Sequence, residues 1–155
     1  MMFFNNKMKP YLDKVVSINT TNLEYLGFAK LSDGYFFERE INENVKIVVE
    51  AYESDLSSDW AGFEYGTNKI HLEDFIEGSV QDITVLGISL VTQLADRFKK
   101  QFENLSPVFW LGSDEFADLP SVTLGFYVKR ECMVPLLPED QISLDRFANA
   151  LLIVV

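Results

Sequence analysis

The only imidazole in this 155-residue chain belongs to His71, so a Ser-His or Cys-His mechanism would have to use it. In an extended segment over 69–73, His71 and Glu73 project from the same face, where the carboxylate could orient the ring. Such pairs are common by chance in a chain with 24 acidic residues, and a half-exposed strand histidine is the simpler interpretation. The sequence therefore predicts a protein that is not an enzyme.

Metal and phosphate sites find as little support in the sequence. A structural zinc site needs three or four ligands at short spacing, and one histidine with one cysteine, Cys132, does not supply them. The acids of 114–118 lack the turn glycine and the closing glutamate of an EF-hand loop. No glycine-rich phosphate loop follows a predicted strand. We therefore expect neither a metal nor a cofactor.

The most distinctive feature is the segment 50–77, which carries eight carboxylates against one lysine, a local charge of −7 in a chain of −11. It also holds five aromatic residues, and acidic surfaces with rigid aromatics are typical of sites that hold cationic proteins. The alternative is a solvated edge or loop that Trp60 fastens to the core. The residues predicted to bind a basic partner, with Trp60 and Tyr65 as anchors, are Glu53, Asp55, Asp59, Trp60, Glu64, Tyr65, Glu73 and Asp74.

Composition also narrows the classes of partner. A pI near 4.4 and scattered basic residues argue against direct binding of nucleic acid or of anionic membranes. The longest uncharged apolar stretch, 83–95, is too short and too polar to span a bilayer, and the first residues lack the apolar core of a secretory signal. With one cysteine and therefore no internal disulfide, we expect a cytoplasmic protein.

A fold with a substantial core has to position these residues, because 48% of them are apolar. Pro10 and the apolar residues after it predict a short helix over 10–18. Three runs rich in aromatic and β-branched residues, 25–29, 35–41 and 45–52, are separated by turn residues and predict an antiparallel meander. A weaker pattern predicts a hairpin of 63–65 with 69–72.

The clearest helix covers about 80–103, where Ser79 and Asp82 resemble a capping box and apolar residues recur at helical spacing. Strands are predicted over 108–111 and 121–130 with a loop, 112–120, between them, and a helix from Ser143 precedes the apolar end, 151–155. This order predicts one α+β domain over 1–155. It has a mainly antiparallel sheet of about five or six strands, with the long helix and the N- and C-terminal helices mainly on one face.

Size, charge and the missing catalytic groups together predict an acidic protein-binding inhibitor. It would act as an immunity protein or antitoxin does, neutralising a basic toxin such as a nuclease by occluding its active or nucleic-acid-binding site. A mimic of nucleic acid that blocks a DNA-binding protein is a close variant. The alternatives are a structural or assembly subunit that uses the apolar C-terminus, 150–155, and an enzyme of unfamiliar type that uses His71.

Overall fold

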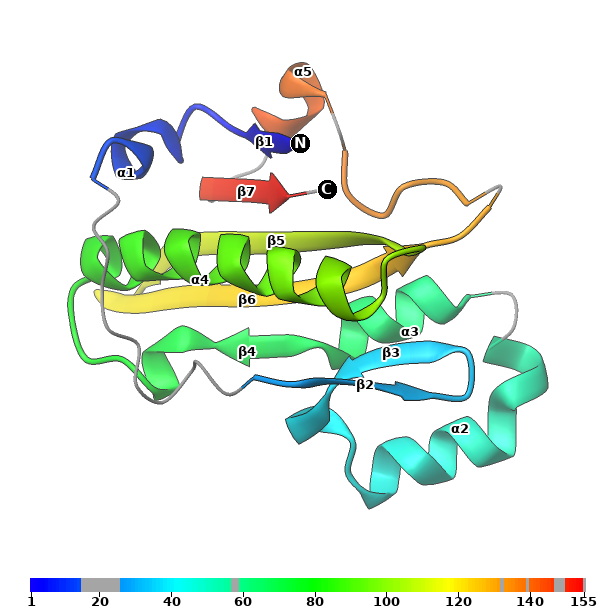
Figure 1. Cartoon of the computed structure of the whole chain (residues 1–155). Helices are drawn as coiled ribbons and strands as arrows, with labels where there is room; N and C mark the ends of the chain where they lie inside the picture. Colours follow the sequence, from blue (N-terminus) through cyan, green and yellow to red (C-terminus); the bar gives the residue numbers. More distant parts are fainter. Residues whose placement is uncertain (15–25, 57–58, 132, 139, 147–149, 155) are drawn as a thin grey trace.

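The structure is a computed structural model that describes the chain except residues 15–25, 57–58, 132, 139, 147–149 and 155, and it describes only the backbone of 52–56, 116, 141–142 and 150–151. Five antiparallel strands form one sheet in the order β1-β7-β5-β6-β4, and β2 and β3 form a separate hairpin (Figure 1). The predicted α+β class with one domain is confirmed.

The strands are β1 (Met2–Phe4), β2 (Phe28–Leu31), β3 (Gly34–Phe37), β4 (Lys69–His71), β5 (Ser106–Phe116), β6 (Leu119–Lys129) and β7 (Ala150–Val154). The helices are α1 (Lys9–Leu12), α2 (Glu43–Leu56), α3 (Trp60–Thr67), α4 (Val80–Gln101) and α5 (Gln141–Leu144), with 3-10 turns η1 (Glu38–Glu40) and η2 (Leu72–Asp74).

Helix α4 begins at the predicted capping box. The Ser79 hydroxyl accepts a hydrogen bond from the backbone N–H of Asp82, and the Asp82 carboxylate accepts one from the backbone N–H of Ser79. Lys99 and Lys100 lie in the last turn, where cations stabilise the helix dipole. The sequence signals for the start and the end of the predicted helix therefore agree with the observed ends of α4.

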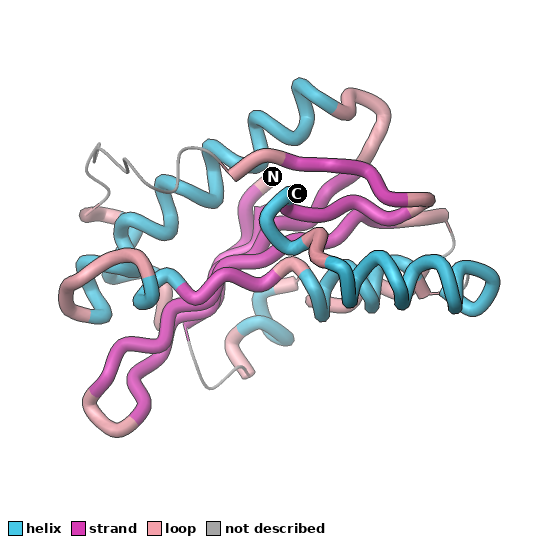
Figure 2. Tube along the Cα trace, turned by 90° about the horizontal axis from the view of Figure 1, so that it is seen from below, coloured by secondary structure: helices cyan, strands magenta, loops and turns pink. Residues whose placement is uncertain are grey.

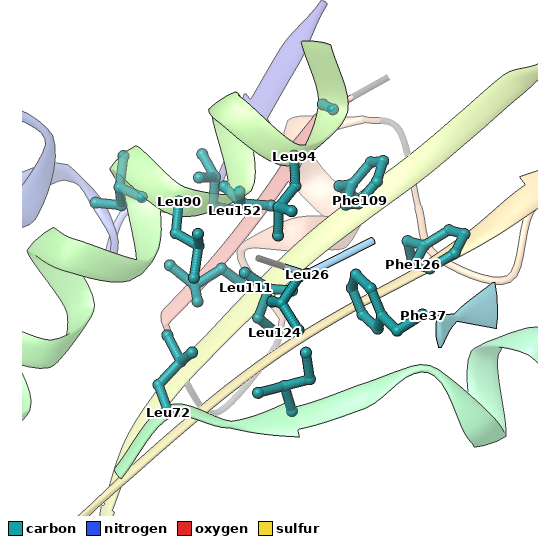
Figure 3. Packing of buried hydrophobic residues seen from close by; sticks show 14 of the residues in the cluster. Leu26, Phe37, Leu72, Leu90, Leu94, Phe109, Leu111, Leu124, Phe126 and Leu152 are labelled. Atoms are coloured by element: carbon teal, nitrogen blue, oxygen red, sulfur yellow. The ribbon is translucent and has the colours of Figure 1, made fainter. Parts of the chain in front are cut away.

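One face of the sheet is covered by α4, whose apolar stripe meets the inward residues of the central strands. Figure 3 shows Leu90 and Leu94 of this helix above Phe109, Leu111 and Phe126. The approach is close at Gly87, where an added Cβ would lie 2.8 Å from a Leu111 methyl group. This layer is the main core of the protein.

The opposite face of the sheet is covered only in part. Ala61 of α3, Leu137 and Leu144 pack with Trp110 and Ile153 in a second apolar layer. Helix α3 therefore lies on the face opposite α4, and beyond Trp110 the outward residues of β4, β5 and β6 line a surface hollow. The sequence did not indicate this second layer.

Two segments predicted as strands are helices. Residues 45–52 belong to α2 and residues 63–65 to α3, and β4 pairs with β6 rather than with 63–65. Val45 and Val49, one helical turn apart, both pack on the Trp60 cluster. The polar residues before these segments cap helices instead of making hairpin turns, because Asn42 accepts a hydrogen bond from the Val45 N–H and Asp59 accepts one from the Gly62 N–H.

The predicted loop 112–120 is instead the end of a long hairpin. All of β5 pairs with β6, from Ser106 opposite Lys129 to Phe116 opposite Leu119. In Figure 2 the end of this hairpin extends beyond the other strands of the sheet. The prediction of a buried strand over 108–111 underestimated the length of β5, because the outer half of the strand carries charged residues.

The apolar C-terminal segment forms β7 between β1 and β5, and Leu152 and Ile153 are fully buried on its two faces. Parts of the predicted helices over 10–18 and from 143, the start of the strand 25–29, and Cys132 lie outside the described residues. In the described residues α1 ends at Leu12 and is followed by a turn at 13–14, and β2 begins at Phe28. The prediction of a helix from Ser143 onward is wrong beyond Leu144, because α5 ends there, 145–146 form a turn and 150–154 belong to β7. No described helix combines the length and the apolar character needed to cross a membrane.

The turn between β5 and β6 yields a stability prediction. Ala117 and Asp118 have φ of 50° and 64°, the left-handed region of a type I′ turn, where alanine costs about 1 kcal/mol. Ala117→Asn is therefore expected to raise the free energy of unfolding by roughly 1 kcal/mol, measured by urea denaturation. The same change at the exposed helical residue Ala51 should lower it by roughly 0.5 kcal/mol, and equal effects at both sites would contradict the turn assignment.

Candidate functional site

The acidic segment 50–77 does not form a single surface. Glu53 and Asp55 belong to α2, and their side chains lie outside the described part of the structure. Asp59 is exposed and caps α3, with its Oδ1 atom 3.0 Å from the Gly62 nitrogen. Glu73 and Asp74 lie in η2 after β4, so the structure separates them from the residues at the start of α3.

Trp60 lies in the core, with 4% of its surface exposed, so the prediction that it is an accessible anchor is wrong. Its indole packs with Phe36 and Val49, and an added Cβ at Gly34 would lie 2.6 Å from the ring. The sequence analysis assigned Val49 to a strand, whereas α2 brings it onto the indole. The alternative, in which Trp60 fastens a segment to the core, describes the structure.

Glu64 is also buried, with no exposed surface, and cannot meet a partner as predicted. Its carboxylate accepts hydrogen bonds from the backbone N–H groups of Tyr35 and Val128, both at 2.8 Å. The Arg130 guanidinium donates two more, at 2.6 and 2.7 Å. Burial raises the pKa of the Glu64 carboxyl, against the opposing effect of Arg130 and the two N–H groups. The carboxylate thus has a structural role.

Asn68, one turn after Glu64, contributes to the same set of hydrogen bonds between the hairpin and the sheet. Its Oδ1 atom accepts from the Phe37 N–H at 3.0 Å, and its amide donates to the Tyr35 and Phe126 carbonyls at 2.9 and 3.3 Å. Strand β4 pairs with β6 only over 123–125, so Glu64 and Asn68 bind the β6 backbone where that pairing stops. One side chain of α3, Glu64, and that of the residue after the helix, Asn68, therefore join the β2–β3 hairpin to the sheet in place of a strand ladder.

Tyr65 is half-buried and lies against other side chains. The centroid of the Tyr65 ring is 5.3 Å from that of Trp110 and 6.1 Å from that of Tyr127. The Lys69 ammonium lies 4.9 Å from the Tyr65 centroid. Burial raises the pKa of its phenol. The ring therefore supports Lys69 and Trp110, which limits the surface it presents as an anchor.

Carboxylates gather instead at the end of the sheet where β4 ends, α4 begins and the β5–β6 hairpin turns, on the left in Figure 1. The contact of η2 with β6 is fixed by Glu73, whose Oε2 atom accepts from the Val122 N–H at 2.9 Å. The start of α4 is held to β5 by the hydrogen bond between the Thr84 and Ser113 hydroxyls, at 2.5 Å. We call this region the acidic end; its carboxylates are Glu73, Asp74, Glu77, Asp82, Asp114, Glu115 and Asp118.

The acidic end combines charge with exposed apolar side chains. Six of its seven carboxylates are exposed and Glu73 is half-buried, while the sequence has no lysine or arginine over 70–96 or 111–128. Leu119 is 67% exposed and Phe75 40% exposed in the same region. The Arg39 guanidinium lies 4.6 Å from the Phe75 ring centroid and is a cation near this surface.

The sequence analysis predicted Glu73 and Asp74 but missed the rest of the acidic end. It considered the acids of 114–118 only as metal ligands, because it placed them in a loop far from 73–74. The β5–β6 pairing brings the two groups to one end of the sheet. No local signal marks 112–116 as a strand, because polar or small residues lie on both sides of it, and only the pairing with β6 shows that β5 continues.

His71 and Glu73 do lie together, as their spacing predicted. The His71 Nδ1 atom is 3.4 Å from Glu73 Oε1 and 3.3 Å from the Thr123 hydroxyl. A nucleophile–histidine–acid relay needs the hydroxyl and the carboxylate on different ring nitrogens, whereas here both contact Nδ1. Among the described residues, no group of three or more His, Cys, Asp or Glu side chains is placed to hold a metal ion.

Comparison with other proteins gives a family without an assigned activity. No curated protein and no solved structure matches this chain. The model of the Uncharacterized protein PM0498 family matches residues 3–154, which is nearly the whole chain. The protein therefore belongs to the Uncharacterized protein PM0498 family.

Proposed function

We propose that this protein is an acidic protein-binding inhibitor of the cytoplasm, an immunity protein or antitoxin that neutralises a basic toxin such as a nuclease. The observation that carries the proposal is the acidic end, where seven carboxylates from η2, the segment after it, the start of α4 and the β5–β6 hairpin lie at one end of the sheet. A surface of this charge offers a nuclease the same sign of potential as the phosphates of its substrate. Occlusion of the nucleic-acid groove would then block the enzyme.

Binding would combine electrostatic steering with a small apolar contact. The carboxylates repel one another in the free protein, and lysine or arginine residues of a partner would relieve that repulsion. Leu119, at the end of the extended hairpin, and Phe75 supply apolar surface that docking would remove from water. The carboxylates of the acidic end, Leu119 and Phe75 are therefore the proposed contact residues, in place of Trp60 and Glu64, which are buried.

The alternatives have less support from the described residues. An assembly subunit that uses 150–155 would need that segment at the surface, whereas Leu152 and Ile153 are fully buried within the sheet. An enzyme that uses His71 would need a nucleophile on the second ring nitrogen, and no described residue bonds it. Asp59 remains exposed, but because it caps α3 its replacement would disturb the helix as well as the charge.

The proposal predicts an association rate that depends on the charge of the hairpin. In the triple variant Asp114→Asn, Glu115→Gln, Asp118→Asn, association with the partner at low salt should slow by about tenfold or more, because steering is lost. The partner is first captured from the native lysate at low ionic strength and purified, and its rates are then measured by stopped flow. The difference between variant and wild type should fade at high salt.

A matched control carries the same charge change away from the acidic end, with Asp96→Asn, Glu103→Gln and Glu131→Gln, all at exposed positions. Its association rate should remain within about twofold of wild type if position matters more than net charge. Equal rates for the two triple variants would reject the acidic end as the interface. A captured protein whose own activity is unchanged by saturating wild-type protein would reject the inhibitor function.

A further inference from the structure

A second surface feature lies on the sheet face opposite α4, beyond the edge of Trp110. It is a hollow of about 370 Å³, lined by Lys69, His71, Trp110, Gly112, Asp114, Ser121 and Thr123. The strand register explains its shape, because Gly112 and Thr123 lie side by side in one row and leave the floor of the hollow low. His71 belongs to the same row on β4. Leu119 lies farther along the same face of β6, two residues from Ser121 toward the hairpin turn.

The His71 imidazole is held in place by its Nδ1 side. Nδ1 contacts the Glu73 carboxylate and the Thr123 hydroxyl, while Glu73 is itself anchored by the Val122 N–H. The His71 side chain is 54% exposed, and no described residue forms a hydrogen bond with its Nε2 atom. The arrangement leaves Nε2 free for a ligand in the hollow that His71 lines.

Lys69 brings a positive charge to the same strand, two residues from His71 and on the same side. Its ammonium lies over the Tyr65 ring, and no carboxylate of a described residue is within 4.0 Å of it. The Tyr65 ring is in turn packed at a tilt of 34° against Trp110, so a second aromatic ring supports the one that the ammonium contacts. Because the Tyr65 ring holds the ammonium in place and no described carboxylate neutralises it, the ammonium can bind an anion with little further loss of side-chain entropy.

Asp114 is the opposing charge, and the register places it on the far side of the hollow. Lys69 pairs with Gly125, His71 with Thr123, and Asp114 with Ser121, so the acid lies two rows from the lysine. At roughly 3.4 Å per residue the two rows are about 13 Å apart along the strands. An anion would therefore occupy the Lys69–His71 half, where a hydroxyl, an ammonium and an imidazole converge.

We propose that this hollow binds a small oxyanion, a carboxylate or a phosphate group, through Lys69, His71 and Thr123. Lys69 supplies the charge, the His71 Nε2 atom donates a hydrogen bond whenever it carries a proton, and the small side chains on the floor let the ligand approach the sheet. Glu73 is a positioning residue that fixes the ring. The proposal does not rest on the proposed inhibitor function, although Glu73 and Asp114 belong to both this site and the acidic end.

The test is an NMR titration of the whole protein with inorganic phosphate and, separately, with acetate, each against sodium chloride at matched ionic strength. His71 is the only histidine, so its ring signals report on the site without ambiguity, and the indole N–H of Trp110 reports on the wall while that of Trp60 serves as a reference. We expect saturable shifts of the His71 signals with one or both anions. The anion that produces them identifies the ligand class.

Three variants complete the test. Lys69→Gln should weaken binding by about tenfold, the loss of one charge-assisted contact. Lys46→Gln removes the same charge from α2, where Lys46 pairs with Glu43, and should leave the affinity within about twofold of wild type. Asp114→Asn should tighten binding slightly. Shifts no larger than those with sodium chloride, or equal affinities in the two lysine variants, would overturn the proposal.

Discussion

Replacing Glu64 with alanine is expected to lower the free energy of unfolding by about 3–5 kcal/mol, the usual cost of removing one member of a buried ion pair. The substitution would leave the Tyr35 and Val128 N–H groups and the inner face of Arg130 without their acceptor. It would also free one of the two side chains that join the β2–β3 hairpin to the sheet. Urea denaturation followed by circular dichroism measures the change.

The control for this prediction is Glu50→Ala, which removes an exposed carboxylate from α2 and should change stability by less than about 0.5 kcal/mol. Arg130→Met tests the same pair from the other side. Without the guanidinium, the pKa of the buried Glu64 carboxyl is raised further. A group whose pKa is higher in the folded protein than in the unfolded chain stabilises the fold fully at a pH below the unfolded-state pKa, and this stabilisation is lost as pH rises through the folded-state pKa. The destabilisation by Arg130→Met should therefore grow as pH rises above about 4, the ordinary pKa of a glutamate. A pH-independent loss would contradict the account.

The double substitution Leu152→Ala, Ile153→Ala is expected to cost about 4–10 kcal/mol, a large part of the 5–15 kcal/mol that stabilises a typical domain. Leu152 packs in the layer under α4 and Ile153 packs with Trp110 on the other face. Because the two side chains lie in different layers, their separate losses should add. Thermal and urea unfolding of both single variants and the double variant measure this.

Leu119→Ala is the matched control, because Leu119 is the most exposed leucine of the described residues and should change stability by less than about 0.5 kcal/mol. A double variant of β7 that unfolds cooperatively with a loss below about 2 kcal/mol would contradict the central position of that strand. The result also bears on the assembly hypothesis. A folded variant that merely dissociates from an oligomer would favour assembly over a structural role for β7.

Helix α4, strand β6 and the inner half of β5 could be predicted because each carries its own local signal. The capping box and the apolar stripe define α4, and the alternation of 122–128 defines β6. Helix α2 was misassigned because Val45, Ile47 and Val49 also alternate, as a strand would require. A β-branched run of this length fits both patterns, and tertiary packing of Val45 and Val49 on Trp60 decides between them.

The candidate site was predicted less well than the fold, because charge density along the chain does not give proximity in space. Glu64 belongs to the most acidic segment, yet Arg130, sixty-six residues away, compensates its burial. The acidic end depends on the pairing of β6 with both β4 and β5, a long-range register that local periodicity does not specify. The His71–Glu73 contact was predictable because it is local.

The attachment of the β2–β3 hairpin has a consequence for the evolution of the family. A strand ladder is made by the main chain, so most substitutions leave its hydrogen bonds in place. Here the equivalent bonds come from Glu64 and Asn68, and few other residues offer acceptors and donors of the same reach. Mutational tolerance should therefore be lowest at these two positions and at Arg130, and higher at the exposed acids of the hairpin tip.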